Sequence, residues 1–188
     1  MKGCRPMTDV EISSVFNQLG NKRDKSLFLL GCKSGLRISE LLSLKVGDVL
    51  EYGIVGNYVT VAKCNTKGKA ESKTLPLSKS AKETLQDYLN DFGVLDHRAP
   101  LFKSFQSQEP ITRQQAHRIL KGAFKSLKMQ GKLATHSLRK TFAHKVHIAL
   151  GEKIERTKVA LCHKSLSSTS HYIQVDREEV ENAILGLG

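Results

Sequence analysis

The stretch Ser-Gly-Leu-Arg-Ile-Ser-Glu-Leu-Leu at residues 34–42 separates two helical patterns and decides how the N-terminal half folds. Gly35 frees the backbone for a turn, because glycine adopts positive φ at little steric cost. Arg37 and Glu40 follow three positions apart, which places them on one face of the helix that starts here. Two interpretations stay open for this pair: a surface ion pair worth a few tenths of a kcal/mol, or part of a functional site.

Helical and strand patterns extend on both sides of this stretch. Thr8 and Glu11 form a capping-box pattern at the start of a first helix. Residues 54–55 and 58–61 are β-branched and aromatic, and residues 74–77 follow a Lys-rich turn, which predicts a small antiparallel sheet with a hairpin tip. We therefore predict an α+β, mainly α fold, a helical bundle with a small antiparallel β-sheet, as one domain over 1–188. Further helices are expected near residues 24–33, 36–44, 79–92, 112–128, 136–149, 154–162, 166–173 and 178–185.

Two further stretches carry side chains suited to a phosphate. The sequence Thr-His-Ser-Leu-Arg places His136 and Arg139 on one helix face near an N-terminus, where unpaired N–H groups attract anions. The sequence Leu-Cys-His-Lys-Ser contains His163, and Tyr172 follows nine residues later. Each residue taken alone has an ordinary explanation: a solvated His and Arg, or a tyrosine at the rim of a core.

The charge distribution indicates a polyanionic partner. Thirty Lys and Arg stand against 18 Asp and Glu in 188 residues, a formal net charge of +12. No acidic residue lies between Glu109 and Glu152, whereas nine basic residues do. A solvated helical face explains a short basic run, but a run of this length favours nucleic-acid binding.

Several other classes of protein do not fit the composition. The longest apolar runs, such as residues 27–30, are far shorter than the roughly 20 residues of a membrane span. Residues 1–6 lack the apolar stretch of a signal peptide. The four cysteines lie far apart without a CxxC pair, so we expect a reduced, cytoplasmic protein without a disulfide framework. His144 and His147 share a helix face but have no Cys or carboxylate nearby, so we expect no metal ion.

Taken together and in this order, Arg37, His136, Arg139, His163 and Tyr172 resemble the tyrosine recombinase (phage integrase) family. The motifs are Gly-Leu-Arg-x-Ser-Glu-Leu-x-x-Leu, His-x-Leu-Arg-x-Thr-Phe-Ala and Leu-x-His-x-Ser with a later Tyr, and they span nearly the whole chain. The resemblance implies a catalytic domain that breaks and rejoins DNA in site-specific recombination or integration of mobile genetic elements. It also implies double-stranded DNA as partner, a monomer that becomes a tetramer on paired DNA sites, no cofactor, no membrane, and a place at a prokaryotic nucleoid.

The same resemblance assigns roles to individual residues. Tyr172 is the implied nucleophile, which attacks phosphorus and leaves a 3′-phosphotyrosyl enzyme. A lysine of the hairpin protonates the leaving 5′-oxygen; Lys67, between Thr and Gly, matches the family context, and Lys69 stays open as the second choice. Glu40 is expected to orient basic side chains without touching substrate. The four residues implied to surround the phosphate are Arg37, His136, Arg139 and His163, and those expected to bind DNA are Lys69, Arg113, Arg118 and Lys140.

Two departures from the family pattern bear on this interpretation. Cys162 stands where the family usually has Gly before the second His, and we expect a Cys to be small enough to pack there. The chain also has no room for the N-terminal core-binding domain of full-length integrases, so it is either a truncated catalytic domain or a short member. Two alternative functions use the same fold: a DNA-binding regulator that does not cut, and a type IB topoisomerase-like enzyme.

Overall fold

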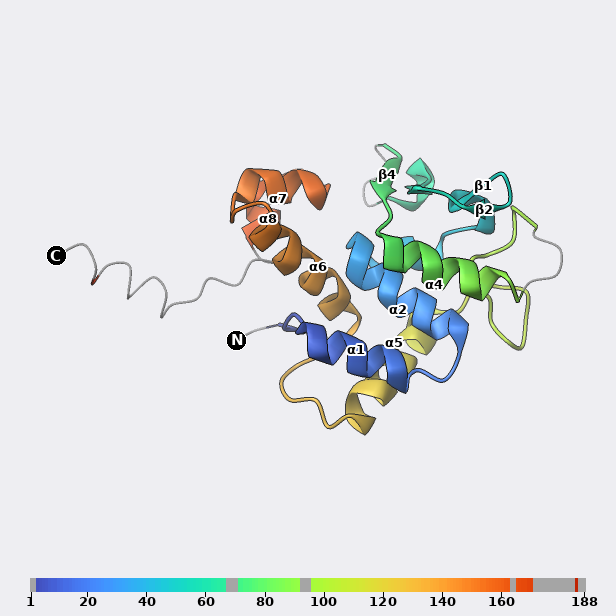
Figure 1. Cartoon of the computed structure of the whole chain (residues 1–188), viewed down its shortest axis with the longest axis horizontal. Helices are drawn as coiled ribbons and strands as arrows, with labels where there is room; N and C mark the ends of the chain where they lie inside the picture. The colour runs from blue at the N-terminus through green and yellow to red at the C-terminus, as the bar shows by residue number, and fades with distance from the viewer. Residues whose placement is uncertain (1–2, 67–70, 92–95, 163–164, 171–184, 186–188) are drawn as a thin grey trace. The chain divides into compact units, whose positions relative to one another are not determined.

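The computed structural model describes residues 3–66, 71–91, 96–162, 165–170 and Leu185. The chain divides into two compact units, Met1–Phe142 and Ala143–Gly188. Most of the described residues are helical, which confirms the predicted mainly α fold with a small antiparallel part (Figure 1). None of the described helices is long and apolar enough to cross a membrane.

The first helix begins and the second helix ends at the predicted signals, although the second starts at Lys22, two residues earlier than predicted. At the start of α1 (Asp9–Gln18), the Thr8 hydroxyl accepts a hydrogen bond from the Glu11 N–H, and the Glu11 carboxylate accepts one from the Thr8 N–H. The predicted capping box is therefore confirmed. Helix α2 (Lys22–Ser34) ends at Gly35, whose φ of 64° lies in the left-handed region that glycine favours.

The other helices follow in the predicted order. Helix α3 starts two residues later than predicted, because Arg37 is extended, with ψ of 150°, and serves as the N-cap. In the first unit these helices are α3 (Ile38–Leu42), α4 (Lys79–Leu89), α5 (Arg113–Ser126) and the N-terminal part of α6 (Thr135–Ala149).

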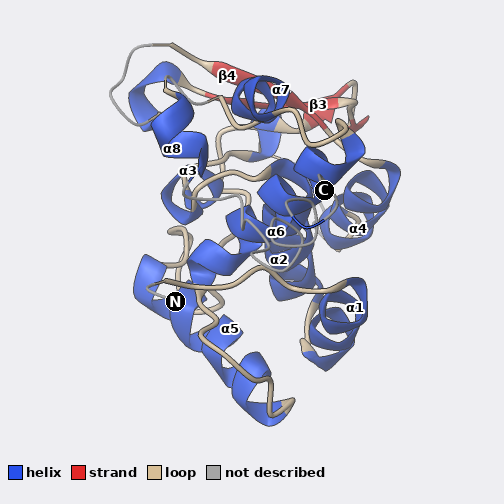
Figure 2. Ribbon diagram, turned by 90° about the vertical axis from the view of Figure 1, so that its left-hand side faces the viewer, coloured by secondary structure: helices blue, strands red, loops and turns tan. Residues whose placement is uncertain are grey.

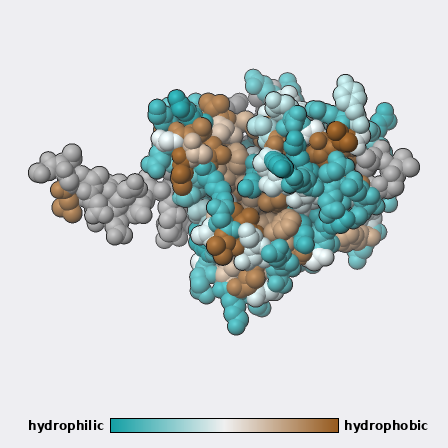
Figure 3. Space-filling model, in the orientation of Figure 1, coloured by the Kyte–Doolittle hydropathy of each residue, from teal (hydrophilic) through white to brown (hydrophobic). Residues whose placement is uncertain are grey.

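Helix α2 is buried on two sides, so it separates two apolar clusters of the first unit. Leu27 and Leu30 pack in one cluster with the strands and α4. Phe28 and Cys32 pack in the other with α1, α5 and the start of α6. Helices α1, α2 and α4 lie side by side in Figure 1, and hydrophilic side chains cover the outer face of α4 (Figure 3). The nearly continuous apolar run in α2 is thus typical of a central helix.

The predicted β-structure consists of two separate two-stranded ladders. Both ladders are antiparallel, as predicted, but the prediction of a single sheet is wrong. The first ladder ends at Gly56, whose N–H donates to the Val49 carbonyl at 2.9 Å. The chain turns there and enters the second ladder. The strands are β1 (Leu50–Glu51) paired with β2 (Ile54–Val55), and β3 (Tyr58–Val61) paired with β4 (Lys73–Pro76).

The β3–β4 hairpin leads to the Lys-rich tip. The two strands lie side by side in Figure 2, and Val61 opposite Lys73 is the last pair before the tip. Beyond this pair, the Thr66 hydroxyl donates to the Glu71 carbonyl at 3.0 Å. This hydrogen bond ties together the two ends of the tip, whose residues 67–70 lie outside the described residues.

The second unit contains the remainder of α6, α7 (Ile154–Ala160) and α8 (Leu166–Ser170). A ring nitrogen of His147 lies 2.9 Å from the Thr157 hydroxyl and joins α6 to α7. The helix predicted near 166–173 is confirmed as far as residue 170. The helix predicted near 178–185 falls, except for its last residue, outside the described residues.

Candidate active site and nucleic-acid interface

The corner at Gly35 brings α6 against the start of α3. A Cβ at Gly35 would lie 2.3 Å from Cδ1 of Phe142, so only glycine permits this close packing. Nη1 of Arg139 donates to the Gly35 carbonyl, which joins the first sequence motif to the second. Arg139 is only 3% exposed, so α6 and the corner hold its guanidinium in one place.

Glu40 lies at the centre of a buried polar cluster in this corner. The Arg37 N–H donates to its Oε2 at 2.8 Å, and Nη1 of Arg37 donates to Oε1 at 3.2 Å. Nζ of Lys73, on β4, donates to the same Oε1 at 2.5 Å. The Glu40 side chain is 1% exposed, so the interpretation of Arg37 and Glu40 as a surface ion pair is wrong.

The protonation state of Glu40 follows from this cluster. Burial opposes ionisation of the carboxyl, but the hydrogen bond from Lys73, the Arg37 N–H and the two nearby charges outweigh it and lower the pKa of Glu40. Glu40 is therefore ionised at neutral pH and links the first arginine of the motif to the end of the hairpin next to its tip.

Lys73 is a site residue that the motifs did not single out. Its ammonium lies 2.5 Å from Oε1 of Glu40, closer than the Arg37 guanidinium at 3.2 Å. Lys73 and Leu75 are alternate residues of β4, and both are less exposed than the residues between and after them. A lysine on the inward face of a strand is the sequence signal that identifies it.

We expect Glu40→Gln to destabilise the chain by about 3 kcal/mol at neutral pH, because it leaves the Lys73 ammonium beside a neutral amide. A carboxyl with a lowered pKa stabilises the fold above its unfolded pKa, about 4.5, and this stabilisation is lost as the pH falls through the folded pKa. The difference between wild type and variant should therefore shrink from pH 4.5 downward, as measured by urea unfolding. Glu83→Gln, at an exposed pair 3.9 Å from Lys79, is the control. Equal losses for both variants would contradict the prediction.

His136 lies on the first turn of α6, beside the cluster. Partial burial lowers the pKa of His136, and the positive charges of Arg139, Arg37 and Lys140 lower it further. His136 is therefore neutral at pH 7, so one ring nitrogen donates and the other accepts. Arg139 binds the Gly35 carbonyl, and Ile38 and Thr135, the neighbours of Arg37 and His136, line one hollow, so the structure brings the two motifs together.

The N-terminal half of α5 borders the same corner. Arg113 and Arg118 are exposed and, with Gln114 and His117, line a shallow hollow that also includes Ile38 of α3 and Thr135 of α6. Lys140, the other predicted DNA-binding residue described, is half-buried on α6. The hollow thus combines cations with amide and imidazole groups, the side chains that contact phosphates and base edges.

Four predicted residues lie outside the described residues: Lys67, Lys69, His163 and Tyr172. Their positions stay predictions. Cys162, just before His163, is described and has φ of 50°, in the left-handed region. This conformation costs a non-glycine residue roughly 1 kcal/mol, which explains why the family favours glycine here. We expected the small size of Cys to decide whether it fits here. The backbone conformation is the property that favours glycine at this position.

Comparison with known proteins identifies the family of the chain. Residues 7–179 match the phage integrase family, and the chain belongs to that family of tyrosine recombinases. The probable integrase/recombinase YoeC of Bacillus subtilis (strain 168) is 33% identical over 163 residues, which cover 87% of this chain and 83% of that protein. Tyrosine recombinase XerC of Thermodesulfovibrio yellowstonii is 33% identical over 164 residues, covering 82% of this chain and 51% of XerC. The chain thus spans most of YoeC but about half of XerC.

The fold has also been seen in solved structures. The XerH site-specific recombinase, in a post-cleavage complex with a palindromic difH substrate, matches with a TM-score of 0.75 and 20% identity. The match covers 95% of this chain and 51% of that chain. The tyrosine recombinase catalytic-domain fold is therefore confirmed.

Proposed function

We propose that this chain is the catalytic part of a site-specific recombinase that cuts and rejoins DNA through a 3′-phosphotyrosyl intermediate. The observation that carries the proposal is the corner at Gly35, where the motif of Arg37 and the motif of His136 and Arg139 meet. Membership of the phage integrase family supports the same reaction.

Arg37 and Arg139 neutralise the non-bridging oxygens of the phosphate that is cut. Guanidinium groups are always charged and present paired donors that match two phosphate oxygens. Fixed donors in a partly buried site stabilise the additional charge of the transition state without reorganising. Burial holds Arg139 in place, and the hydrogen bonds that Arg37 donates to Glu40 hold Arg37, so both guanidinium groups are fixed. Neutral His136 donates a further hydrogen bond or moves a proton.

Tyr172 forms a bond from its phenolic oxygen to phosphorus, and the bond from phosphorus to the 5′-oxygen breaks. His163 or His136 accepts the phenolic proton, and Lys67 gives a proton to the departing 5′-oxygen. The product is a 3′-phosphotyrosyl enzyme with a free 5′-hydroxyl. Because the new diester keeps the energy of the broken one, attack by another 5′-hydroxyl rejoins DNA without a nucleotide cofactor.

A nicked suicide substrate tests the proposal. Cleavage beside the nick releases a short fragment, so rejoining fails and the protein stays covalently attached to DNA. We expect an adduct that resists denaturation in SDS, formed in excess EDTA and without nucleotide. A mobility shift without an adduct would identify a non-cleaving DNA-binding protein. Relaxation of supercoiled plasmid without joining of two sites would identify a topoisomerase-like enzyme.

The partner we propose is double-stranded DNA, bound along the exposed N-terminal half of α5, and the site of action is the nucleoid of a prokaryotic cell. XerH was solved on its difH substrate, which supports a DNA partner. We further propose a monomer in solution and a tetramer on paired sites, since recombination joins two duplexes and each cut strand needs one Tyr172.

Binding should weaken steeply with salt, because each phosphate neutralised contributes about −0.9 to the slope of log K against log salt. Removing Arg113 and Arg118 together should therefore make the slope shallower by about 2. The control removes Lys121 and Lys125, two exposed cations at the other end of α5. Fluorescence anisotropy at several salt concentrations measures both slopes. Equal changes in the two double variants would argue against the hollow beside Ile38 as the DNA-binding surface.

A further inference from the structure

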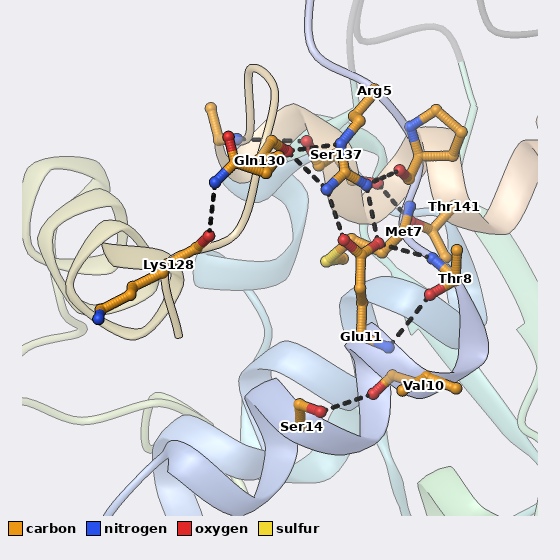
Figure 4. A network of polar contacts seen from close by, with 12 residues as sticks. Arg5, Met7, Thr8, Val10, Glu11, Ser14, Lys128, Gln130, Ser137 and Thr141 are labelled. Carbon is orange, nitrogen blue, oxygen red and sulfur yellow. Dashed lines mark hydrogen bonds and ion pairs between the residues drawn. The ribbon is translucent and has the colours of Figure 1, made fainter. Parts of the chain in front are cut away.

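The N-terminal segment holds a polar network centred on Arg5, a residue that none of the sequence motifs includes (Figure 4). The Arg5 side chain lies between α1 and the connection from α5 to α6. Its Nε and Nη2 donate to the Gln130 carbonyl at 2.8 and 2.7 Å, and its backbone N–H donates to the Lys132 carbonyl at 3.0 Å. Arg5 therefore binds two carbonyls of the connection that leads directly into α6.

Glu11 of α1 fixes the guanidinium of Arg5 from the other side. Nη1 donates to Oε2 at 2.7 Å and Nη2 to Oε1 at 2.5 Å, so the pair is bidentate. The hydrogen bond to Arg5 lowers the pKa of Glu11, and the hydrogen bond to Glu11 raises the pKa of Arg5. Because Glu11 also belongs to the capping box at Thr8, the position of Arg5 is tied to the first turn of α1.

The same segment holds α6 at a second point. The Met7 N–H donates to the Thr141 hydroxyl at 2.9 Å, and that hydroxyl donates to the Ser137 carbonyl at 2.8 Å. The connection also closes around Arg5: at Gly131, with φ of 78°, a Cβ would lie 2.9 Å from Nε of Arg5. The segment therefore binds the chain just before the first turn of α6, at Gln130 and Lys132, and again at Thr141. The site residues His136 and Arg139 lie between these two points.

We propose that the Arg5–Glu11 pair positions the start of α6 and so sets where His136 and Arg139 meet the phosphate. This inference rests on the proposed function, since it assigns positioning residues to that reaction. Among the described residues, the hydrogen bonds that reach Gln130 and Lys132 from outside the connection come from Arg5. A displacement of catalytic groups by about 1 Å can reduce a rate about 10²-fold, so a small shift of α6 has a large effect.

Arg5→Lys is the most informative variant, because it keeps the charge and the backbone N–H but cannot bind the Glu11 carboxylate and the Gln130 carbonyl as a planar fork. We expect cleavage of the suicide substrate at saturating DNA to slow by about 10- to 100-fold. DNA affinity should stay almost unchanged, because the cations of α5 are intact. Glu11→Gln should act in the same direction more weakly, since the amide keeps one acceptor.

A second measurement does not depend on activity. The pKa of His136 is lowered by partial burial and by the charges of Arg139, Arg37 and Lys140, so it reports where the start of α6 lies. In the Arg5→Lys protein, NMR titration of the folded chain without DNA should show this pKa rising toward its ordinary value. A role in stability alone would lower the melting temperature and leave the pKa of the folded protein unchanged.

Lys22→Ala is the control, because it breaks ion pairs of 3.0 and 2.8 Å to Asp87 and Asp91 that join α2 to α4, away from the start of α6. It should leave both the cleavage rate and the pKa of His136 as in the wild type. A folded Arg5→Lys protein with wild-type values for both overturns the inference. If the wild-type chain forms no adduct, the proposed function fails, and the titration alone then decides whether Arg5 positions α6.

Discussion

Tyr172→Phe is expected to abolish the covalent adduct completely while DNA affinity stays at the wild-type level. The phenylalanine ring keeps the shape of the side chain but lacks the oxygen that would bond to phosphorus, so no alternative step can form the intermediate. The suicide substrate detects the adduct after denaturation, and a mobility shift at the same salt concentration measures affinity.

Tyr52→Phe is the matched control for this experiment. Tyr52 is fully exposed in the turn between β1 and β2, and losing its hydroxyl should change neither the adduct nor the affinity. An adduct of normal yield from the Tyr172→Phe protein would remove Tyr172 from the nucleophile role. Loss of both adduct and affinity would indicate instead that this residue is needed for binding.

Local signals in the sequence predicted the helices well. Thr8 and Glu11 form the capping box, and Gly35 ends α2, because caps and left-handed residues depend on neighbours within a few positions. The division of the β-structure into two ladders was not predicted, since pairing partners depend on how the turn at Gly56 directs the chain. The start of α3 was misplaced by two residues because Arg37 caps the helix instead of opening its first turn.

The candidate site was predictable as a set of residues but not as a structure. The motifs indicate Arg37 and Arg139, yet they do not reveal that Arg139 is buried against Gly35, a contact between residues 104 positions apart. Spacing likewise cannot show that Lys73 reaches Glu40 from another element. Such contacts depend on tertiary packing, and no local pattern encodes them.

The Glu40 cluster connects the arginine corner to the hairpin. Because Glu40 holds Lys73 at the start of β4, next to the tip, and the Thr66 hydroxyl donates to the Glu71 carbonyl, both ends of the tip are restrained. Lys73 is occupied by this ion pair and is thereby a supporting residue. The proton for the 5′-oxygen is therefore expected from a lysine of the tip, Lys67 or Lys69.

Lys67→Ala should slow cleavage of ordinary DNA by about 10²- to 10⁴-fold, the usual contribution of a general acid. Replacing the bridging 5′-oxygen by sulfur creates a leaving group that needs no proton, so the variant should recover most of its rate on this substrate. Arg37→Ala should show no comparable recovery, because charge on the non-bridging oxygens is still unstabilised. Single-turnover cleavage gives, for each variant, the ratio of its rate on the sulfur-substituted DNA to its rate on ordinary DNA.

Two further lysines make this experiment selective. Lys73→Ala should be slow on both substrates, because losing the partner of Glu40 disturbs the corner and removes no proton donor. Recovery in Lys69→Ala but not in Lys67→Ala would move the acid to Lys69 and keep the mechanism. If sulfur restores neither variant, the hairpin does not protonate the leaving group. Its lysines would then bind the DNA backbone. Removing each of them would make the slope of log K against log salt shallower by about 0.9, the contribution of one phosphate contact.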